Sequence, residues 1–351
     1  MTISSARSKP ETWLAPALAA AVLIALFVWL WQFRLAALFR HETAGQVVSR
    51  APLVAVDGAP VWLVPIYTTA NYVNTTWETT LAALLIAGTL QTFLHAPLLR
   101  LLKTQTGWRA YFAGVAFGLP NLLCTCCAAP LFAGLYKKGT PLGTALATFV
   151  TAPSLNLLVL ILALAFLPFP LALARIVLGL AAALCVPYLA ARLGHAGPPP
   201  MVARDDEVEP MAWLALAQTW VRNIWELARL AIPLLILGYF LIGVFQILVP
   251  LKTVAPLLGD SPVSLVVVAL IGTLIMVPTF SEIALVSTLV PLGMGMAPAV
   301  ALLITAPAVS LPSLLVVGRA TNSWRIPLAL GGLVFLLGVV GGAAFSALMG
   351  A

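Results

Sequence analysis

Two stretches of this chain repeat one pattern and decide how its helices are expected to run. Residues 144–157 read TALATFVTAPSLNL, and residues 298–311 read PAVALLITAPAVSL. When they are aligned on their prolines, at an offset of 307 − 153 = 154, both contain Thr-Ala-Pro followed three positions later by a polar residue, Asn156 or Ser310. A pattern repeated at matching places in two halves is typical of secondary transporters. We therefore expect an internal duplication.

The same offset relates a second pair of motifs, each in the middle of an apolar segment. Residues 120–127 read PNLLCTCC and residues 278–282 read PTFSE, so that Ser281 corresponds to Cys127. Proline lacks a backbone donor and clashes with the preceding helical turn, so each half is predicted to contain a broken or re-entrant helix. The predicted helix-breaking residues are the prolines Pro120, Pro153, Pro278 and Pro307.

The composition points to an all-α polytopic membrane protein. Hydrophobic residues make up 62% of the 351 residues and charged residues 8%, whereas soluble domains carry about 25% charged residues. A helix needs about 20 apolar residues to cross a bilayer core, and nine segments of suitable composition recur along the chain. These segments are 13–33, 76–99, 110–135, 143–167, 171–191, 229–250, 263–290, 297–317 and 326–349.

A polar linker around residues 195–210 separates the two halves. After it, residues 211–229 place three tryptophans among charged residues, a pattern that predicts an interfacial amphipathic helix. The expected organisation has four parts: a first transmembrane helix and loop at 1–75, repeat 1 at 76–195, the linker and interfacial helix at 196–228, and repeat 2 at 229–351.

The basic residues favour an inverted arrangement of the two repeats. If all nine segments cross once from a cytoplasmic N-terminus, several basic residues fall outside, against the cytoplasmic excess of Lys and Arg. These residues are Lys137, Lys138, Arg192 and Arg204. If segments 110–135 and 263–290 are re-entrant hairpins instead, all four lie inside, and Arg175 lies near the outer face. We therefore predict seven crossings and two hairpins in a bacterial plasma membrane, with lipid and not nucleic acid as the partner of this basic chain.

Three clustered thiols are the most specific chemical feature. Cys124, Cys126 and Cys127 lie within four residues beside a predicted helix break. Thiolates are soft ligands that suit copper(I), zinc and, by the same chemistry, trivalent arsenic. The alternatives are that each cysteine is a small buried hydrophobe, or that Cys124 and Cys127 shuttle disulfide electrons. An electron shuttle would need a further partner cysteine, and Cys185 is the remaining cysteine of the chain.

Glu282 is the acidic residue placed deep in an apolar segment, where an ionisable side chain is costly and a candidate for function. The alternative is that it lies nearer an interface or satisfies a helix end. Polar residues at the paired breaks would line a substrate path, although each alone is more typical of a helix-to-helix hydrogen bond. These candidates are Thr151, Asn156, Ser281, Thr305 and Ser310.

The quoted motifs resemble the ArsP/YraQ-type permease family. Residues 119–130, 133–143 and 151–153 resemble its first conserved half, and residues 295–299 and 305–315 its second. The family's Cys-Ser-Cys-Gly motif maps onto residues 124–127, so that Cys127 replaces a glycine. The resemblance covers residues 76–349 and implies efflux of trivalent organoarsenicals, copper or zinc.

Together these observations predict a permease that exports a thiophilic metal or metalloid, that is, a metal-resistance or arsenical-resistance function. The sequence contains no G-x-x-x-x-G-K-[ST] motif, so we expect transport driven by a gradient, with no catalytic site and no cofactor. Two alternatives stay open: a membrane thiol–disulfide electron carrier, and a permease for a small sulfur-containing solute. The sequence does not decide between a monomer and a homo-oligomer.

Overall fold

The computed structural model describes residues 53–55, 59–93, 108–119, 123–194, 213–248, 259–277, 281–290 and 293–349, together with residues 21, 25 and 28. Within this part of the chain the regular structure is entirely helical, as the composition predicts. Most of the first expected segment, and Pro120 and Pro278, lie outside the described residues.

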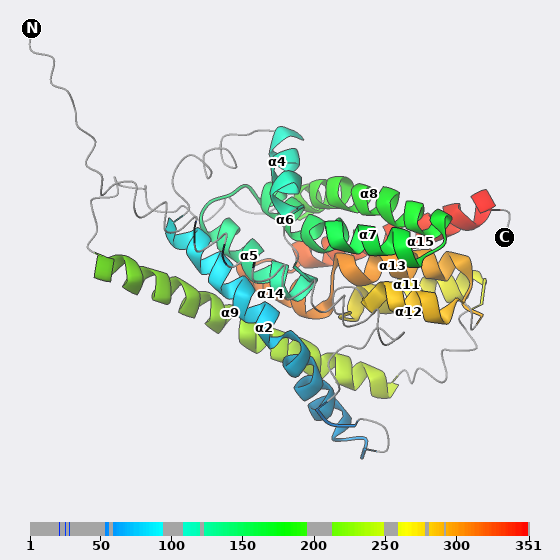
Figure 1. The fold of residues 1–351 in the computed structure, drawn as a ribbon, viewed down its shortest axis with the longest axis horizontal. Helices are drawn as coiled ribbons and strands as arrows, with labels where there is room; N and C mark the ends of the chain where they lie inside the picture. Colours follow the sequence, from blue (N-terminus) through cyan, green and yellow to red (C-terminus); the bar gives the residue numbers. More distant parts are fainter. Residues whose placement is uncertain are drawn as a thin grey trace, which may run out of the picture.

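Twelve helices have defined bounds in the described ranges (Figure 1). They are α2 (Val64–Phe93), α4 (Trp108–Gly118), α5 (Thr125–Lys137), α6 (Leu142–Ser154), α7 (Leu157–Phe166), α8 (Phe169–Leu193), α9 (Trp213–Leu248), α11 (Pro262–Leu274), α12 (Ser281–Leu289), α13 (Met296–Ala308), α14 (Leu311–Thr321) and α15 (Arg325–Met349).

Three described helices are long and apolar enough to cross a membrane. They are Phe169–Leu193, Ala217–Leu241 within α9, and Arg325–Met349, each of 25 residues. At 1.5 Å per residue such a helix is about 38 Å long, which exceeds a bilayer core of about 30 Å. A bent pair, α13 and α14, meets at 42° and adds a fourth span if it crosses as one unit. The expected interfacial helix is continuous with the following span, because α9 runs unbroken from Trp213 to Leu248.

Four of the predicted apolar segments divide into two helices each. The breaks lie between α4 and α5, α6 and α7, α11 and α12, and α13 and α14. α6 ends one residue after Pro153, and α13 ends one residue after Pro307. At the second of these breaks Ser310 caps α14 through a reciprocal pair of hydrogen bonds with Ser313, which satisfies backbone donors of the new helix.

The helices of the two halves follow one another at the spacing of the sequence repeat. Adding 154 to the bounds of α6 gives 142 + 154 = 296 and 154 + 154 = 308, the bounds of α13. The turns before these helices also match, since Gly139 has a φ of 83° and Gly293 a φ of 101°. The Gly139 amide donates to the Tyr136 carbonyl at 2.9 Å, and the Gly293 amide to the Val290 carbonyl at 3.1 Å. Glycine suits both turns because it adopts positive φ without a steric penalty.

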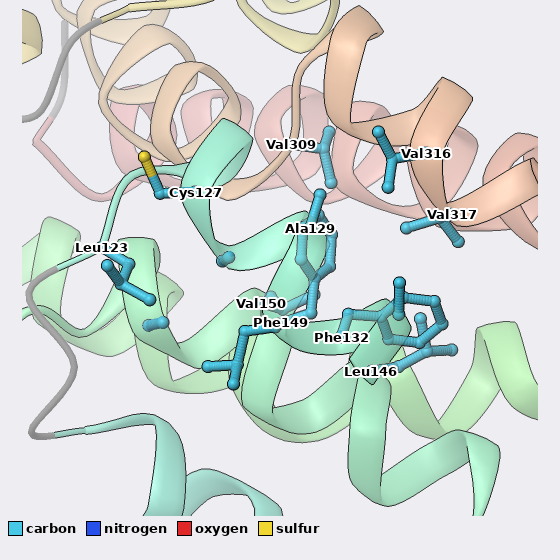
Figure 2. Packing of buried hydrophobic residues seen from close by; sticks show 14 of the residues in the cluster. Leu123, Cys127, Ala129, Phe132, Leu146, Phe149, Val150, Val309, Val316 and Val317 are labelled. Atoms are coloured by element: carbon cyan, nitrogen blue, oxygen red, sulfur yellow. The ribbon is translucent and has the colours of Figure 1, made fainter. Parts of the chain in front are cut away.

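The helices of the two halves interlock. α8 packs against α15, α6 against α13, α5 against α14, and α12 against α7, while α2 and α9 cross along one side of the bundle (Figure 1). One hydrophobic cluster spans both halves (Figure 2). It joins Phe132, Leu146 and Phe149 to Val309, Val316 and Val317. Burial of apolar surface therefore holds the N-terminal half of the bundle to the C-terminal half.

Candidate functional site

The first residues of α5 bring two of the predicted thiols together. Cys124 is the N-cap of α5, and the sulfur atoms of Cys124 and Cys127 lie 3.1 Å apart. Both side chains are buried, with exposed fractions of 5% and 0%, and no disulfide joins them. The Cys127 sulfur points away from the phenyl rings of Phe132 and Phe149 (Figure 2).

The start of α5 faces the start of α14. The hydroxyl oxygens of Thr125 and Ser310 lie 3.0 Å apart in a hydrogen bond, and both side chains are buried. Ser310 is the N-cap of α14, so two helix N-termini from different halves meet beside the thiols. Unsatisfied amides at such ends attract anions and other electron-rich groups.

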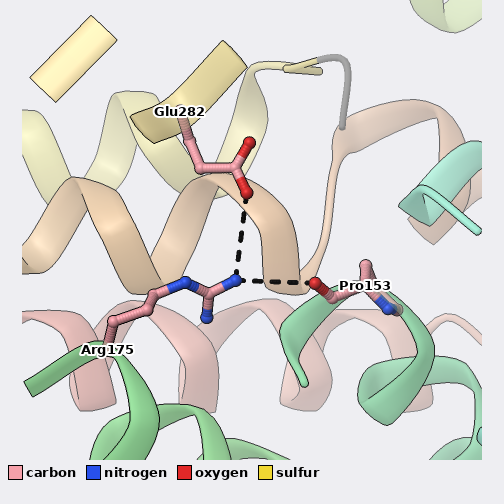
Figure 3. A network of polar contacts seen from close by, with 3 residues as sticks. All are labelled: Pro153, Arg175 and Glu282. Atoms are coloured by element: carbon pink, nitrogen blue, oxygen red, sulfur yellow. Dashed lines mark hydrogen bonds and ion pairs between the residues drawn. The ribbon is translucent and has the colours of Figure 1, made fainter. Parts of the chain in front are cut away.

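A second polar cluster joins α8 to α12 (Figure 3). Glu282 lies in the first turn of α12, and its Oε1 is 3.9 Å from Nη2 of Arg175. The same Nη2 donates to the carbonyl oxygen of Pro153 at 3.5 Å, at the C-terminal end of α6. The exposed fractions of Arg175 and Glu282 are 0% and 2%. A guanidinium at the end of α6 complements the carbonyls that a helix leaves without intrahelical partners.

Arg175 is a residue of this site that sequence reasoning missed. The charge count used Arg175 only as a basic residue near the outer face, and it did not predict that the whole side chain is buried between helices. The signal was present, since Arg175 lies inside the apolar segment 171–191 and the rule that singled out Glu282 applies equally to it.

The remaining predicted residues are distributed among the helix ends. Asn156 is buried just before α7, and Thr151 is buried in the last turns of α6. Thr305 donates to the carbonyl of Ala301 in its own helix at 2.8 Å. Ser281 begins α12, and its side chain lies outside the description, as does that of Cys126. The structure thus groups Cys124 and Cys127 beside Ser310, and groups Glu282 with Arg175.

Within the described side chains no cluster of three or more His, Cys, Asp or Glu residues could hold a metal ion. The described thiol site is therefore a pair, Cys124 and Cys127, and a pair is enough for a two-coordinate soft ion.

Comparison with known proteins assigns the family. Residues 65–347 match the model of the ArsP_1 family, described as a predicted permease. The chain is 31% identical over 343 residues to UPF0718 protein YraQ of Escherichia coli (strain K12), and the alignment covers 97% of each protein. It is also 29% identical over 125 residues to UPF0718 protein MJ0584 of Methanocaldococcus jannaschii, covering 35% of this chain and 34% of that protein.

No solved structure matches the chain. The family match spans the described helices from α2 to α15. It includes the thiol pair, the Arg175–Glu282 pair and all three apolar helices of membrane-spanning length. The chain is a membrane protein that belongs to the ArsP_1 family of predicted permeases.

Proposed function

We propose that this permease exports a thiophilic metal or metalloid species through the bacterial plasma membrane, driven by a gradient. The observation that carries the proposal is the buried thiol pair, whose sulfur atoms lie 3.1 Å apart at the N-terminus of α5. Two adjacent sulfur atoms offer a soft cation two ligands of the kind that it prefers.

The number of thiols favours some cargoes over others. Cys124 and Cys127 provide two sulfur ligands, and Cys126 would supply a third. Copper(I) and trivalent arsenic are satisfied by two or three thiolates, whereas zinc sites in proteins normally have four ligands. The proposal therefore ranks an organoarsenical or copper(I) above zinc.

The broken helices support a path near the thiols. Discontinuous helices in transporters place helix ends and irregular backbone at the substrate site. In this chain the Ser310 cap of α14 contacts Thr125 beside Cys124, and Asn156 occupies the corresponding break between α6 and α7. We propose that Thr151, Ser281 and Thr305 line the same path from neighbouring helix ends.

The two halves are proposed to be an inverted duplication. Gly118 of α4 packs closely on Thr151 of α6, and at the same offset Gly272 of α11 packs on Thr305 of α13. Helices α5 and α12 also exchange partners, since α5 packs against α14 and α12 against α7. A two-fold relation between the halves produces such exchanged contacts. Rocking of one repeat against the other would then give alternating access.

The test is uptake into inside-out vesicles that contain the wild-type protein or the Cys124→Ser/Cys126→Ser/Cys127→Ser variant. Methylarsenite, arsenite, copper(I) and zinc are offered in parallel, and we expect thiol-dependent accumulation of one of the first three. The matched control is Cys185→Ser, which removes the exposed cysteine on α8 and should transport as the wild type does. Equal accumulation by the triple variant and the wild type would contradict the proposal.

The thiol distance also favours one alternative, a thiol–disulfide electron carrier. A C-x-x-C pair at a helix N-terminus is the arrangement of many dithiol redox sites. The two functions differ in the resting state, because an electron carrier predicts a reversible disulfide between Cys124 and Cys127 in membranes. The metal proposal predicts that both thiols stay reduced, which alkylation followed by mass spectrometry measures. A permease for a sulfur-containing solute instead predicts that none of the four metal or metalloid species accumulates and that uptake of the solute depends on the thiols.

A further inference from the structure

Arg175 has more hydrogen-bonding capacity than its protein surroundings use. Within the described part of the chain, Nε and Nη1 of its guanidinium have no hydrogen-bond partner, although the side chain is completely buried. The third nitrogen, Nη2, reaches Glu282 only at 3.9 Å and the Pro153 carbonyl at 3.5 Å. A tight guanidinium–carboxylate hydrogen bond is about 2.7–2.9 Å long. The observed pair is therefore loose and leaves two donor nitrogens unused.

The guanidinium lies at the break between α6 and α7. A Cβ added to Gly179 would lie 3.1 Å from the Ser154 carbonyl and 3.4 Å from Nη1 of Arg175, which places Nη1 beside the last residue of α6. The Ser154 hydroxyl also has no partner among the described atoms. α7 begins three residues after Ser154 with Leu157, and its first amides need acceptors from outside the helix. The donors of Arg175 and Ser154 that have no partner among the described atoms thus belong to the break where α7 begins.

We propose that Arg175 is the centre of a binding site for a small anion, a carboxylate or an inorganic oxyanion, which replaces the Glu282 carboxylate at the guanidinium. Arginine does not lose its proton in proteins, so the buried charge needs one anionic partner at all times. In the structure that partner is Glu282. When Glu282 takes up a proton the place becomes vacant for an external anion, so anion and proton bind together. The proposal does not depend on the thiol site.

Few other ionisable groups surround the pair. α6, α7 and α13 carry none, and Glu282 is the acidic residue of α12. The other helices packed on α8 contribute Arg109 and Tyr111 in the first turn of α4 and Arg325 at the first residue of α15. α8 itself adds three groups in its last turns, Cys185, Tyr188 and Arg192. Glu282 is thus the acidic group available to balance Arg175 on these helices.

The experiment measures anion-dependent stability of the purified full-length protein in detergent. Thermal unfolding is followed by tryptophan fluorescence while acetate, phosphate or sulfate replaces chloride at constant ionic strength. Acetate reports on a carboxylate and the other two on an inorganic oxyanion. Wild type is compared at about pH 8 and about pH 5. A carboxyl group ordinarily titrates just below this range, so its protonated fraction is larger at the lower pH. We expect at least one anion to bind more tightly at the lower pH.

Two variants make the test specific. Glu282→Gln removes the competing carboxylate, so it should bind the anion at about pH 8 at least about tenfold more tightly than wild type. The matched control Arg175→Met/Glu282→Gln has no buried charge and should show no specific anion effect. Cys124→Ser/Cys127→Ser should keep the anion response, which separates this proposal from the thiol function.

An anion effect of the same size in the Arg175→Met/Glu282→Gln control would overturn the proposal. It would also be overturned if none of the three anions stabilises wild type more at about pH 5 than at about pH 8. The wild-type comparison decides the matter even if Glu282→Gln does not fold.

Discussion

Arg175 and Glu282 differ in what each does when its partner is lost. Arg175→Met leaves Glu282 buried, but a carboxyl group can take up a proton and become neutral. Glu282→Gln leaves a guanidinium that cannot lose its charge. Breaking a buried pair typically costs about 3–5 kcal/mol. We expect Glu282→Gln in chloride buffer to reach this range, and Arg175→Met to cost less.

The double variant Arg175→Met/Glu282→Gln provides the control for this pair. Because it removes both charges, it should recover most of the stability lost in Glu282→Gln, as judged by a double-mutant cycle of unfolding midpoints. Additive losses would mean that the 3.9 Å contact carries no coupling.

Sequence reasoning found the thiols and Glu282, but it missed Arg175 and therefore missed this pairing. The thiols stand out because three cysteines lie within four residues, and Glu282 stands out because an acidic residue is rare in an apolar helix. The partner of Glu282 lies 282 − 175 = 107 residues earlier, and no local pattern relates the two positions. Arg175 becomes its partner only because α6, α8 and α12 converge at one break, which is a property of the tertiary structure.

At the scale of elements, the turn at Gly293 gives a clean test of backbone conformation. A Cβ added there meets no atom within 4 Å, so Gly293→Ala changes conformational strain without creating a clash. With a φ of 101°, alanine should cost about 1–2 kcal/mol, because left-handed backbone is unfavourable for residues with a Cβ.

Gly332 in α15 is the matched control for the Gly293 turn. Its added Cβ also meets nothing within 4 Å, but it lies inside a helix. Gly332→Ala should stabilise the protein by up to about 1 kcal/mol. We expect Gly293→Ala to lower the temperature of thermal unfolding and Gly332→Ala to raise it. A stabilising Gly293→Ala would contradict the assigned turn.

The breaks between helices were predictable only in part. Proline at positions 153 and 307 marks the last turns of α6 and α13, as loss of a backbone donor would suggest. Hydropathy nevertheless runs through the α6–α7 break as one segment, because Leu155 in the break and Leu157 at the start of α7 are apolar. The end of α6 also accepts a hydrogen bond from Arg175 of α8, a contact that the local sequence does not encode.

At the scale of the whole molecule, the arrangement in the membrane is open to a direct test. With two hairpins and seven crossings, a reporter fused near Ala203 should read as cytoplasmic and one near Lys252 as extracytoplasmic. If all nine apolar segments cross, both reporters change sides. Paired fluorescent and alkaline phosphatase fusions at the two positions make this measurement. An extracytoplasmic signal at Ala203 would rule out the inverted hairpin arrangement.

The contact between Thr125 and Ser310 joins positions separated by 185 residues. A ribosome adds about 5–20 residues per second, so roughly 10–40 s pass between the synthesis of the two contact residues. During that time the thiols of α5 lack the helix that later covers them. We therefore expect oxidants and metals of the cell to reach Cys124 and Cys127 before the site exists, and a reducing environment during translation to protect them.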